Sequence, residues 1–251
     1  MRGEAVQEWL TTIVAVLIST TGAIVSVAIS RRAAREERLS AAEELTRKFR
    51  EPLLQATSNL QTRIYNIVEL DFFGRFLGAD STDSEKEYTV LHTMYVFARY
   101  FCWLEIVRRE SQYLDPRDAG ISSAVAAGLE DIAETFADSR DIQEKFFRLF
   151  RGEQRALGEV MLVPAEAPTP GAPRWDCLGY ASFVRSLEDE QMARWFRRLR
   201  EDIGEFAKNP ANRDGRLRLI HQRLMDIIDI LDPDARRVPR QLRKRLSVPP
   251  T

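Results

Sequence analysis

The chain has 251 residues and a nearly balanced charge, with 37 lysines and arginines against 38 aspartates and glutamates. A net charge of −1 argues against a chain built throughout as a polyelectrolyte binder of nucleic acid. Without the first 30 residues, the length that remains suits one folded domain, or one domain with a small appendage.

Residues 10–30 form the only long uncharged stretch, LTTIVAVLISTTGAIVSVAIS, which contains no proline and no side-chain amide. A helix of that length reaches roughly 30 Å, about the thickness of the hydrocarbon core of a bilayer. We therefore predict an N-terminal segment and a single transmembrane helix within residues 1–30. A cleaved signal peptide is the competing interpretation, with Ser26-Val27-Ala28 as its cleavage site, but the start is not basic and the apolar run is too long.

Arginines that directly follow the apolar stretch predict its orientation. Arg31, Arg32, Arg35 and Arg38 place the N-terminus outside and the C-terminal domain in the cytoplasm, as a single-pass protein of the cell membrane. Because the cytoplasm is reducing, we expect neither a disulfide nor a cysteine-built metal site from the two cysteines of the chain. Small side chains near one face of the span could also pair two copies of the chain.

Helical periodicity and helix-breaking residues predict an all-α fold for the rest of the chain. A charged juxtamembrane helix occupies residues 31–51, and at Pro52 a new helix starts or the same one kinks. A helical bundle of about eight helices follows over residues 52–233, interrupted by a proline-rich loop over 164–173. No segment alternates with a period of two. The main helices expected beyond residue 80 span residues 85–114, 121–137, 141–161, 180–187, 188–207 and 216–231.

The helix expected over 85–114 is apolar on nearly every face between Met94 and Val107. A helix of that kind is buried either in a membrane or at the centre of a protein. Because Arg99 and Glu105 lie within it, a second membrane span is disfavoured, and we predict the central helix of the bundle.

Arg99 and Glu105 are the candidate site residues of the helical domain, as a possible buried charge cluster. Buried charges are rarely retained unless they are paired or functional. Six residues separate them, so they face different directions and need separate partners, for which residues such as Glu69 or Arg155 are candidates. The two interpretations left open are structural ion pairs and a ligand site.

The last 18 residues, 234–251, are basic, and we predict a flexible tail. Six positive charges lie close together in it: Arg236, Arg237, Arg240, Arg243, Lys244 and Arg245. In a tethered protein these side chains would lie near the anionic lipid of the cytoplasmic leaflet, so they are candidate lipid contacts. The competing interpretation is a solvated end that only improves solubility.

The sequence contains none of the short motifs that would indicate catalysis, a cofactor or a metal. There is no phosphate-cradling glycine loop, no HExxH and no GxSxG. Neither His92 nor His221 has a glutamate three residues before it, as a di-iron bundle site would require. We expect no cofactor, and we lean towards a chain that is not an enzyme.

Three stretches, FREPLLQATSNLQTRIYNI, RYFCWLEIVRRE and LFRGEQRALGE, give the chain a family resemblance. It resembles uncharacterised single-pass, all-helical membrane-anchored proteins of GC-rich bacteria. The resemblance covers most of the part after the span, and it implies no activity.

Three functions are consistent with these patterns. The first is a membrane-tethered, non-enzymatic interaction or signalling module whose partners are the lipid bilayer and another protein. The alternative is a membrane-associated enzyme or small-ligand sensor with a site near Arg99, Glu105 and the polar face of the helix that follows Pro52. The third, binding of nucleic acid through the basic tail, ranks last because the rest of the domain is not basic.

Overall fold

The computed structural model describes residues 48–111, 123–139, 145–166, 173–208 and 214–247. Eight α-helices lie in these ranges, so the predicted all-α helical bundle is confirmed. The segment Leu10–Ser30 lies outside the described residues, and its membrane span stays a prediction. Among the residues that are described, no helix has both the length and the apolar character that a membrane crossing needs.

The elements follow one another along the chain with short connections. The first is the helix over 48–69, which runs without interruption through Pro52. A short 3-10 helix, η2, ends the series. The remaining elements are α2 (Phe72–Leu77), α3 (Asp83–Ser111), α4 (Ser123–Ala137), α5 (Arg151–Glu159), β1 (Leu162–Pro164), β2 (Trp175–Cys177), α6 (Tyr180–Ser186), α7 (Glu190–Lys208), α8 (Gly215–Leu231) and η2 (Arg240–Leu242).

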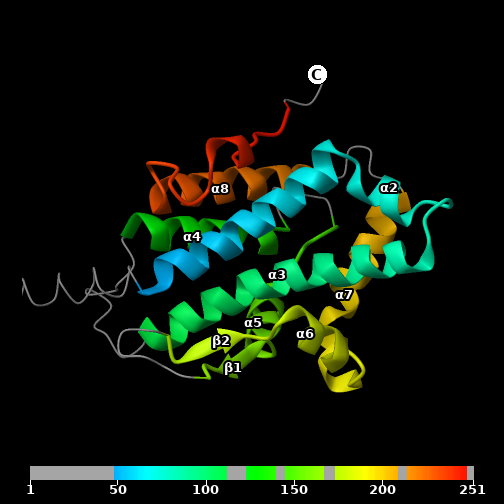
Figure 1. Ribbon diagram of the computed structural model, residues 1–251, viewed down its shortest axis with the longest axis horizontal. Coiled ribbons are helices and arrows are strands. Elements are labelled where there is room, and N and C mark those ends of the chain that lie inside the picture. The colour runs from blue at the N-terminus through cyan, green and yellow to red at the C-terminus, as the bar shows by residue number, and fades with distance from the viewer. Residues whose placement is uncertain (1–47, 112–122, 140–144, 167–172, 209–213, 248–251) are drawn as a thin grey trace, which may run out of the picture.

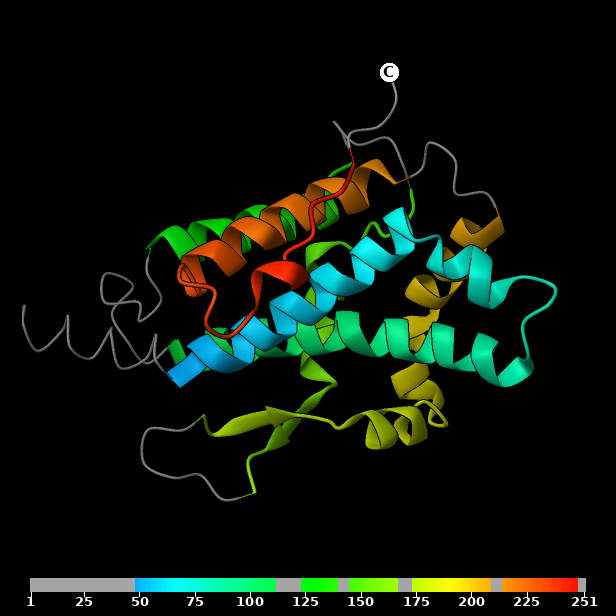
Figure 2. The same cartoon turned by 45° about the horizontal axis from the view of Figure 1, so that its top comes forward.

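Helix α3 lies at the centre of the bundle, as its apolar sequence predicts. Its side chains at Phe97, Tyr100 and Ile106 are completely buried. Helices α2, α5, α6 and α7 and strand β2 pack against it, whereas α4 and α8 pack against each other. Figures 1 and 2 show the 48–69 helix between the α4–α8 pair and α3. Phe136 of α4 also contacts α3 directly, with its ring centroid 6.1 Å from that of Phe97 and 5.2 Å from that of Phe101.

The proline-rich stretch predicted as a loop over 164–173 connects two short strands. Strands β1 and β2 are antiparallel, with Leu162 opposite Cys177 and Pro164 opposite Trp175. Strands of three residues are too short to show an alternating pattern, so the sequence did not indicate them. The hairpin lies on the side of α3 opposite the 48–69 helix (Figure 2).

The expected helix over 141–161 is wrong at residues 145–150, which are not helical, because α5 begins only at Arg151. Phe147 is fully buried there and has a positive φ of 54°, a conformation that a helix does not contain. Its backbone N–H donates to Asp202 of α7 at 2.9 Å. Contacts with a distant helix therefore override the local helical pattern.

Helices α3 and α5 approach closely at Gly158, and this contact generates a prediction. A Cβ atom at Gly158 would lie 2.5 Å from the carbonyl oxygen of Phe101 in the backbone of α3, whereas nothing lies within 4 Å of one at Gly152. Gly158→Ala should lower the free energy of unfolding by about 1–3 kcal/mol through overpacking. Gly152→Ala, the matched control on the same helix, should raise it by up to ~1 kcal/mol through helix propensity. Chemical denaturation of the full chain measures both; equal effects would contradict the close approach.

Candidate functional site

The two charged residues predicted from the sequence do not form one cluster. Arg99 is half-buried and its Nη2 donates to Gln55 Oε1 of the 48–69 helix at 3.2 Å. Glu105 is buried, and its carboxylate accepts hydrogen bonds from Arg108 and Arg109 on the next turn of α3, at 2.5–2.6 Å. Burial acts to raise the pKa of Glu105, but the two guanidinium groups outweigh it and the net pKa is lowered. Glu105 is therefore a paired, ionised carboxylate.

Arg99 lies in the polar cleft, a cavity of about 390 Å³ between the 48–69 helix and α3. Leu242 of η2 also lines it. The residues that face it carry amide, hydroxyl, imidazole and guanidinium groups. The polar lining consists of Ser58, Asn59, Thr62, Arg63 and Asn66 from the first helix and His92, Tyr95 and Arg99 from α3.

Arg63 and His92 meet inside this cleft. Arg63 is only 8% exposed, and its Nη2 lies 2.5 Å from Nδ1 of His92. Since a guanidinium can only donate, Nδ1 is the acceptor and the imidazole carries its proton on Nε2. Burial, and then the charge of Arg63, lowers the pKa of His92 to about 4, so the ring is neutral near pH 7.

Aromatic rings enclose the Arg63–His92 pair. The ring of Phe72 lies 4.3 Å from the guanidinium carbon of Arg63. Tyr88 stacks on the imidazole of His92 with 5.0 Å between ring centroids, and Tyr180 meets it edge-on at 5.4 Å. These contacts hold the imidazole and the guanidinium in fixed orientations.

A second cavity, the apolar groove, has a volume of about 450 Å³ and lies between α3, α4 and α5. Its lining includes the apolar residues Phe101, Leu104 and Leu129, together with Glu105 and its pairing arginine Arg108. Glu105 and Arg99 thus belong to different cavities.

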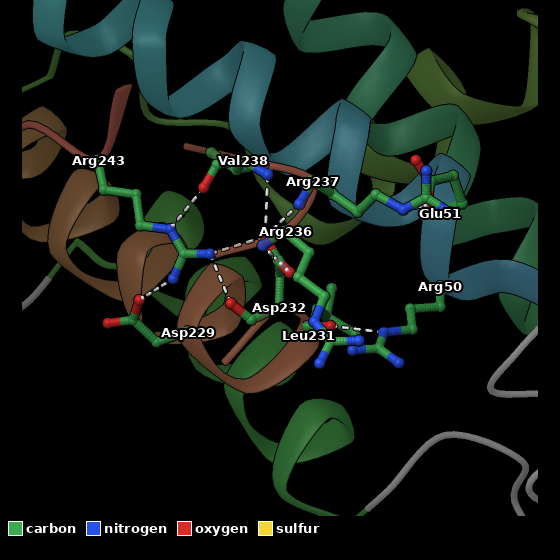
Figure 3. Close-up of polar contacts among 9 residues, drawn as sticks. All are labelled: Arg50, Glu51, Asp229, Leu231, Asp232, Arg236, Arg237, Val238 and Arg243. Atoms are coloured by element: carbon green, nitrogen blue, oxygen red, sulfur yellow. Dashed lines mark hydrogen bonds and ion pairs between the residues drawn. The ribbon is translucent and has the colours of Figure 1, made fainter. Parts of the chain in front are cut away.

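The chain after α8 is fixed to the body by a clasp around Asp232 (Figure 3). Asp232 is 3% exposed, and its carboxylate accepts hydrogen bonds from the backbone N–H groups of Arg236, Arg237 and Val238 at 2.9–3.1 Å. Arg243 Nη2 donates to the same carboxylate at 2.8 Å and its Nη1 donates to Asp229 at 2.7 Å. Burial acts to raise the pKa of Asp232, but these donors lower it overall.

Residues 234–247, which belong to the segment predicted as a flexible tail, lie against the body in the structure, and we call them the basic strap. The strap follows the 48–69 helix along its length, as Figure 2 shows. Arg237 pairs with Glu51 at 3.2 Å, the Lys244 carbonyl accepts from Gln61 at 3.2 Å, and the Ser247 hydroxyl donates to Glu69 at 2.9 Å. Residues 248–251 lie outside the described ranges.

The six basic residues predicted as lipid contacts divide into two kinds. The side chain of Arg243 is only 9% exposed and belongs to the clasp. The other five residues are exposed on the strap: Arg236, Arg237, Arg240, Lys244 and Arg245.

Sequence reasoning missed Arg63, His92 and Asp232 as site residues. A signal for Arg63 was present, because it lies three residues after Leu60 and four before Ile67, within an apolar helical stripe. Asp232 follows the last helix, and its role depends on which later residues fold back onto it. No pattern within the sequence specifies that return.

The described residues contain no group of three or more His, Cys, Asp or Glu side chains that could hold a metal ion. Cys102 is completely buried, and burial raises the pKa of its thiol, so it is not poised as a nucleophile. No family model, curated protein or solved structure matches the chain.

From the contacts of the clasp we predict that the ordered position of the strap depends on the Asp232 carboxylate. Asp232→Asn keeps the shape of the side chain but places an amide donor among backbone donors, so it should destabilise the protein by about 1–3 kcal/mol. The amides of residues 236–238 should lose most of their protection in hydrogen exchange of the full chain. Asp234→Asn, an exposed neighbour, is the control and should change neither quantity. Unchanged protection in Asp232→Asn would contradict the clasp.

The lowered pKa of His221 leads to a prediction of how the stability of the folded protein depends on pH. It is buried, Gln61 Nε2 lies 2.8 Å from its Nε2, and burial lowers its pKa to about 4. Unfolding returns the pKa to about 6.5, so between pH 4 and 6.5 the unfolded chain binds more protons. The contribution of neutral His221 is complete above pH 6.5 and is lost as the pH falls towards 4. The Tm of the full chain should therefore fall more steeply over this range than that of His221→Gln.

Other groups that titrate in the same window are common to both proteins. His92 acts in the same direction as His221, whereas Asp202, with a pKa raised to about 6 by burial, acts in the opposite direction. The difference between the two pH profiles therefore isolates His221. Parallel profiles would show that the His221 ring is not held neutral in the folded state.

Proposed function

We propose that the chain is a membrane-tethered, non-enzymatic interaction module whose helical body is held against the cytoplasmic leaflet by the basic strap. The observation that supports this proposal is the clasp, which turns a basic C-terminal segment into a fixed surface of the fold. A fixed surface loses little conformational entropy when it meets a bilayer, whereas a flexible tail would lose much more.

Fewer basic side chains of the strap are available to contact anionic lipid than the six that the sequence suggests. Arg236 and Arg237 form exposed ion pairs with Asp234 and Glu51, both at 3.2 Å. Within the described part of the chain, Arg240, Lys244 and Arg245 have no ion pair. Each contributes roughly 1 kcal/mol near an anionic leaflet at low salt, so the strap orients the protein and the span anchors it.

The predicted tether makes this weak contact effective. Residues 31–47 separate the predicted span from Lys48, where the described domain begins beside the strap. A chain of that length reaches at most ~60 Å, so the strap stays within molecular distance of the lipid headgroups. Binding becomes intramolecular, and its effective concentration lies in the millimolar range.

The other functions receive different support. A small-ligand site near Arg99 is supported by the polar cleft, whereas Glu105 is already occupied by Arg108 and Arg109. Nucleic acid remains the third candidate, since acidic side chains such as Glu51 and Glu69 interrupt the strap surface. Binding of a second protein, and pairing of two spans, stay predictions.

Resonance energy transfer from a dye on the strap to an acceptor lipid tests the proposal, with the full chain inserted in nanodiscs. A donor dye is attached at Gln241→Cys in a Cys177→Ser background, in which buried Cys102 stays unlabelled. Transfer to an acceptor lipid should be higher in anionic than in neutral nanodiscs, and ~0.5 M salt should remove the difference by screening.

Matched triple variants separate the strap from general electrostatics. Changing Arg240, Lys244 and Arg245 to glutamine should abolish the gain in anionic nanodiscs. Three exposed arginines of α6 and α7 form the control with the same change in charge: Arg185, Arg197 and Arg200. Equal transfer from both lipids, or an equal loss in the control, would contradict a role for the strap in membrane binding.

A further inference from the structure

The guanidinium of Arg63 differs from every other strongly buried charge in the described residues. Buried Arg216 donates to the carbonyls of Thr135, Phe136 and Asp138 at the end of α4. Buried Glu105 and Asp232 each accept from arginines. Arg63, by contrast, has no carboxylate or carbonyl partner within the described part of the chain, and its Nη1 has no hydrogen-bond partner there.

The surroundings of Arg63 do not compensate its charge. Burial lowers the pKa of this guanidinium, and the groups that act in the opposite direction are the hydroxyls of Tyr88 and Tyr180. Neither of these groups is a carboxylate, and His92 is neutral near pH 7. The face of Phe72 offers a cation–π contact, which replaces only part of the lost hydration. A positive charge held in this way is stabilised when an anion binds beside it.

The polar cleft around Arg63 has the lining that such an anion requires. It contains a second guanidinium, Arg99, and no aspartate or glutamate among its lining residues. Arg99 forms no ion pair within the described ranges and donates only to the neutral amide of Gln55. Asn59 and Asn66 supply further donors along the same wall.

We propose that the polar cleft binds a small organic anion, with Arg63 as its principal counter-charge and Arg99 as the second. The guanidinium of Arg63 lines the cleft and its buried Nη1 has no partner, so a carboxylate or phosphate oxygen bound beside it would supply the counter-charge while Nη2 keeps its bond to His92. The basic strap contributes only Leu242 to the lining of this site, and the proposal does not rest on the membrane function proposed above.

The positions of the two arginines suggest the length of the ligand. Arg63 contacts His92, and Arg99 follows His92 by seven residues on α3, which corresponds to about 10 Å along a helix. A cavity of about 390 Å³ accommodates a molecule of metabolite size. A linear molecule with an anionic group at each end therefore fits the cleft best.

Calorimetric titration of the full chain in neutral-lipid nanodiscs tests the site. The probes are adipate, a linear dicarboxylate, and adipamide, its neutral diamide of the same length, at constant ionic strength. Adipate should bind saturably and adipamide should not, because only the carboxylates of adipate carry negative charges that pair with the two guanidinium groups. Absence of saturable adipate binding at tens of millimolar, or equal binding of adipamide, would overturn the proposal.

Variants assign the binding to the cleft. Arg63→Met should weaken adipate binding by about tenfold or more, and Arg99→Gln by a smaller factor, because charge-assisted hydrogen bonds are lost. Arg75→Gln, an exposed arginine of α2, should leave the affinity unchanged within about twofold. If Arg63→Met and Arg75→Gln behave alike, the proposal fails.

A further variant keeps the test valid if Arg63→Met does not fold. Asn59 is exposed at the cleft wall, so Asn59→Asp should fold normally and place a like charge beside the anion. It should weaken adipate binding by a factor comparable to Arg63→Met, and undiminished binding would overturn the site. Repeating the titration in anionic nanodiscs distinguishes sources: lost adipate binding there indicates a lipid headgroup as the natural occupant, and retained binding indicates a soluble anion.

Discussion

The arrangement of the whole bundle depends on the need to cover helix α3. Because α3 is apolar on nearly every face between Met94 and Val107, water must be excluded from all sides of that part, and no single neighbouring helix can achieve that. The 48–69 helix covers one side, α6 and the hairpin cover the opposite side, and α5 also packs against α3. The contact at Gly158 shows how close this covering is, since one extra methyl group would meet the backbone of α3.

Four charged side chains of the described residues are buried in the bundle, and their partners distinguish three structural charges from one candidate functional charge. Glu105 and Asp232 are buried, but each has arginine partners that hold it ionised. Arg216 is buried and saturates the exposed carbonyls at the end of α4. Arg63 alone among these four has no carboxylate or carbonyl beside it in the described residues, and it lies in a cleft rather than in solid core.

Local patterns predicted the helices, while contacts distant in sequence decided the site. The apolar run from Met94 to Val107 was enough to identify the central helix, because burial on all sides leaves a signature within one segment. The strap left no such signature, since its order depends on Asp232 accepting bonds from residues that follow it. Arg63 appeared as one charge in an apolar stripe, and only the packing of α3 shows that the partner facing it is the neutral ring of His92 and not a carboxylate.

The most direct test of the account is the free energy of unfolding of Arg63→Met in the full chain, measured without added anion. If Arg63 is retained for binding, removing an uncompensated buried charge should leave the stability equal to that of the unaltered protein or raise it. If Arg63 instead belongs to a structural ion pair, the substitution should cost about 3 kcal/mol or more, as loss of one partner of a buried pair does. That second result would contradict an anion site at Arg63.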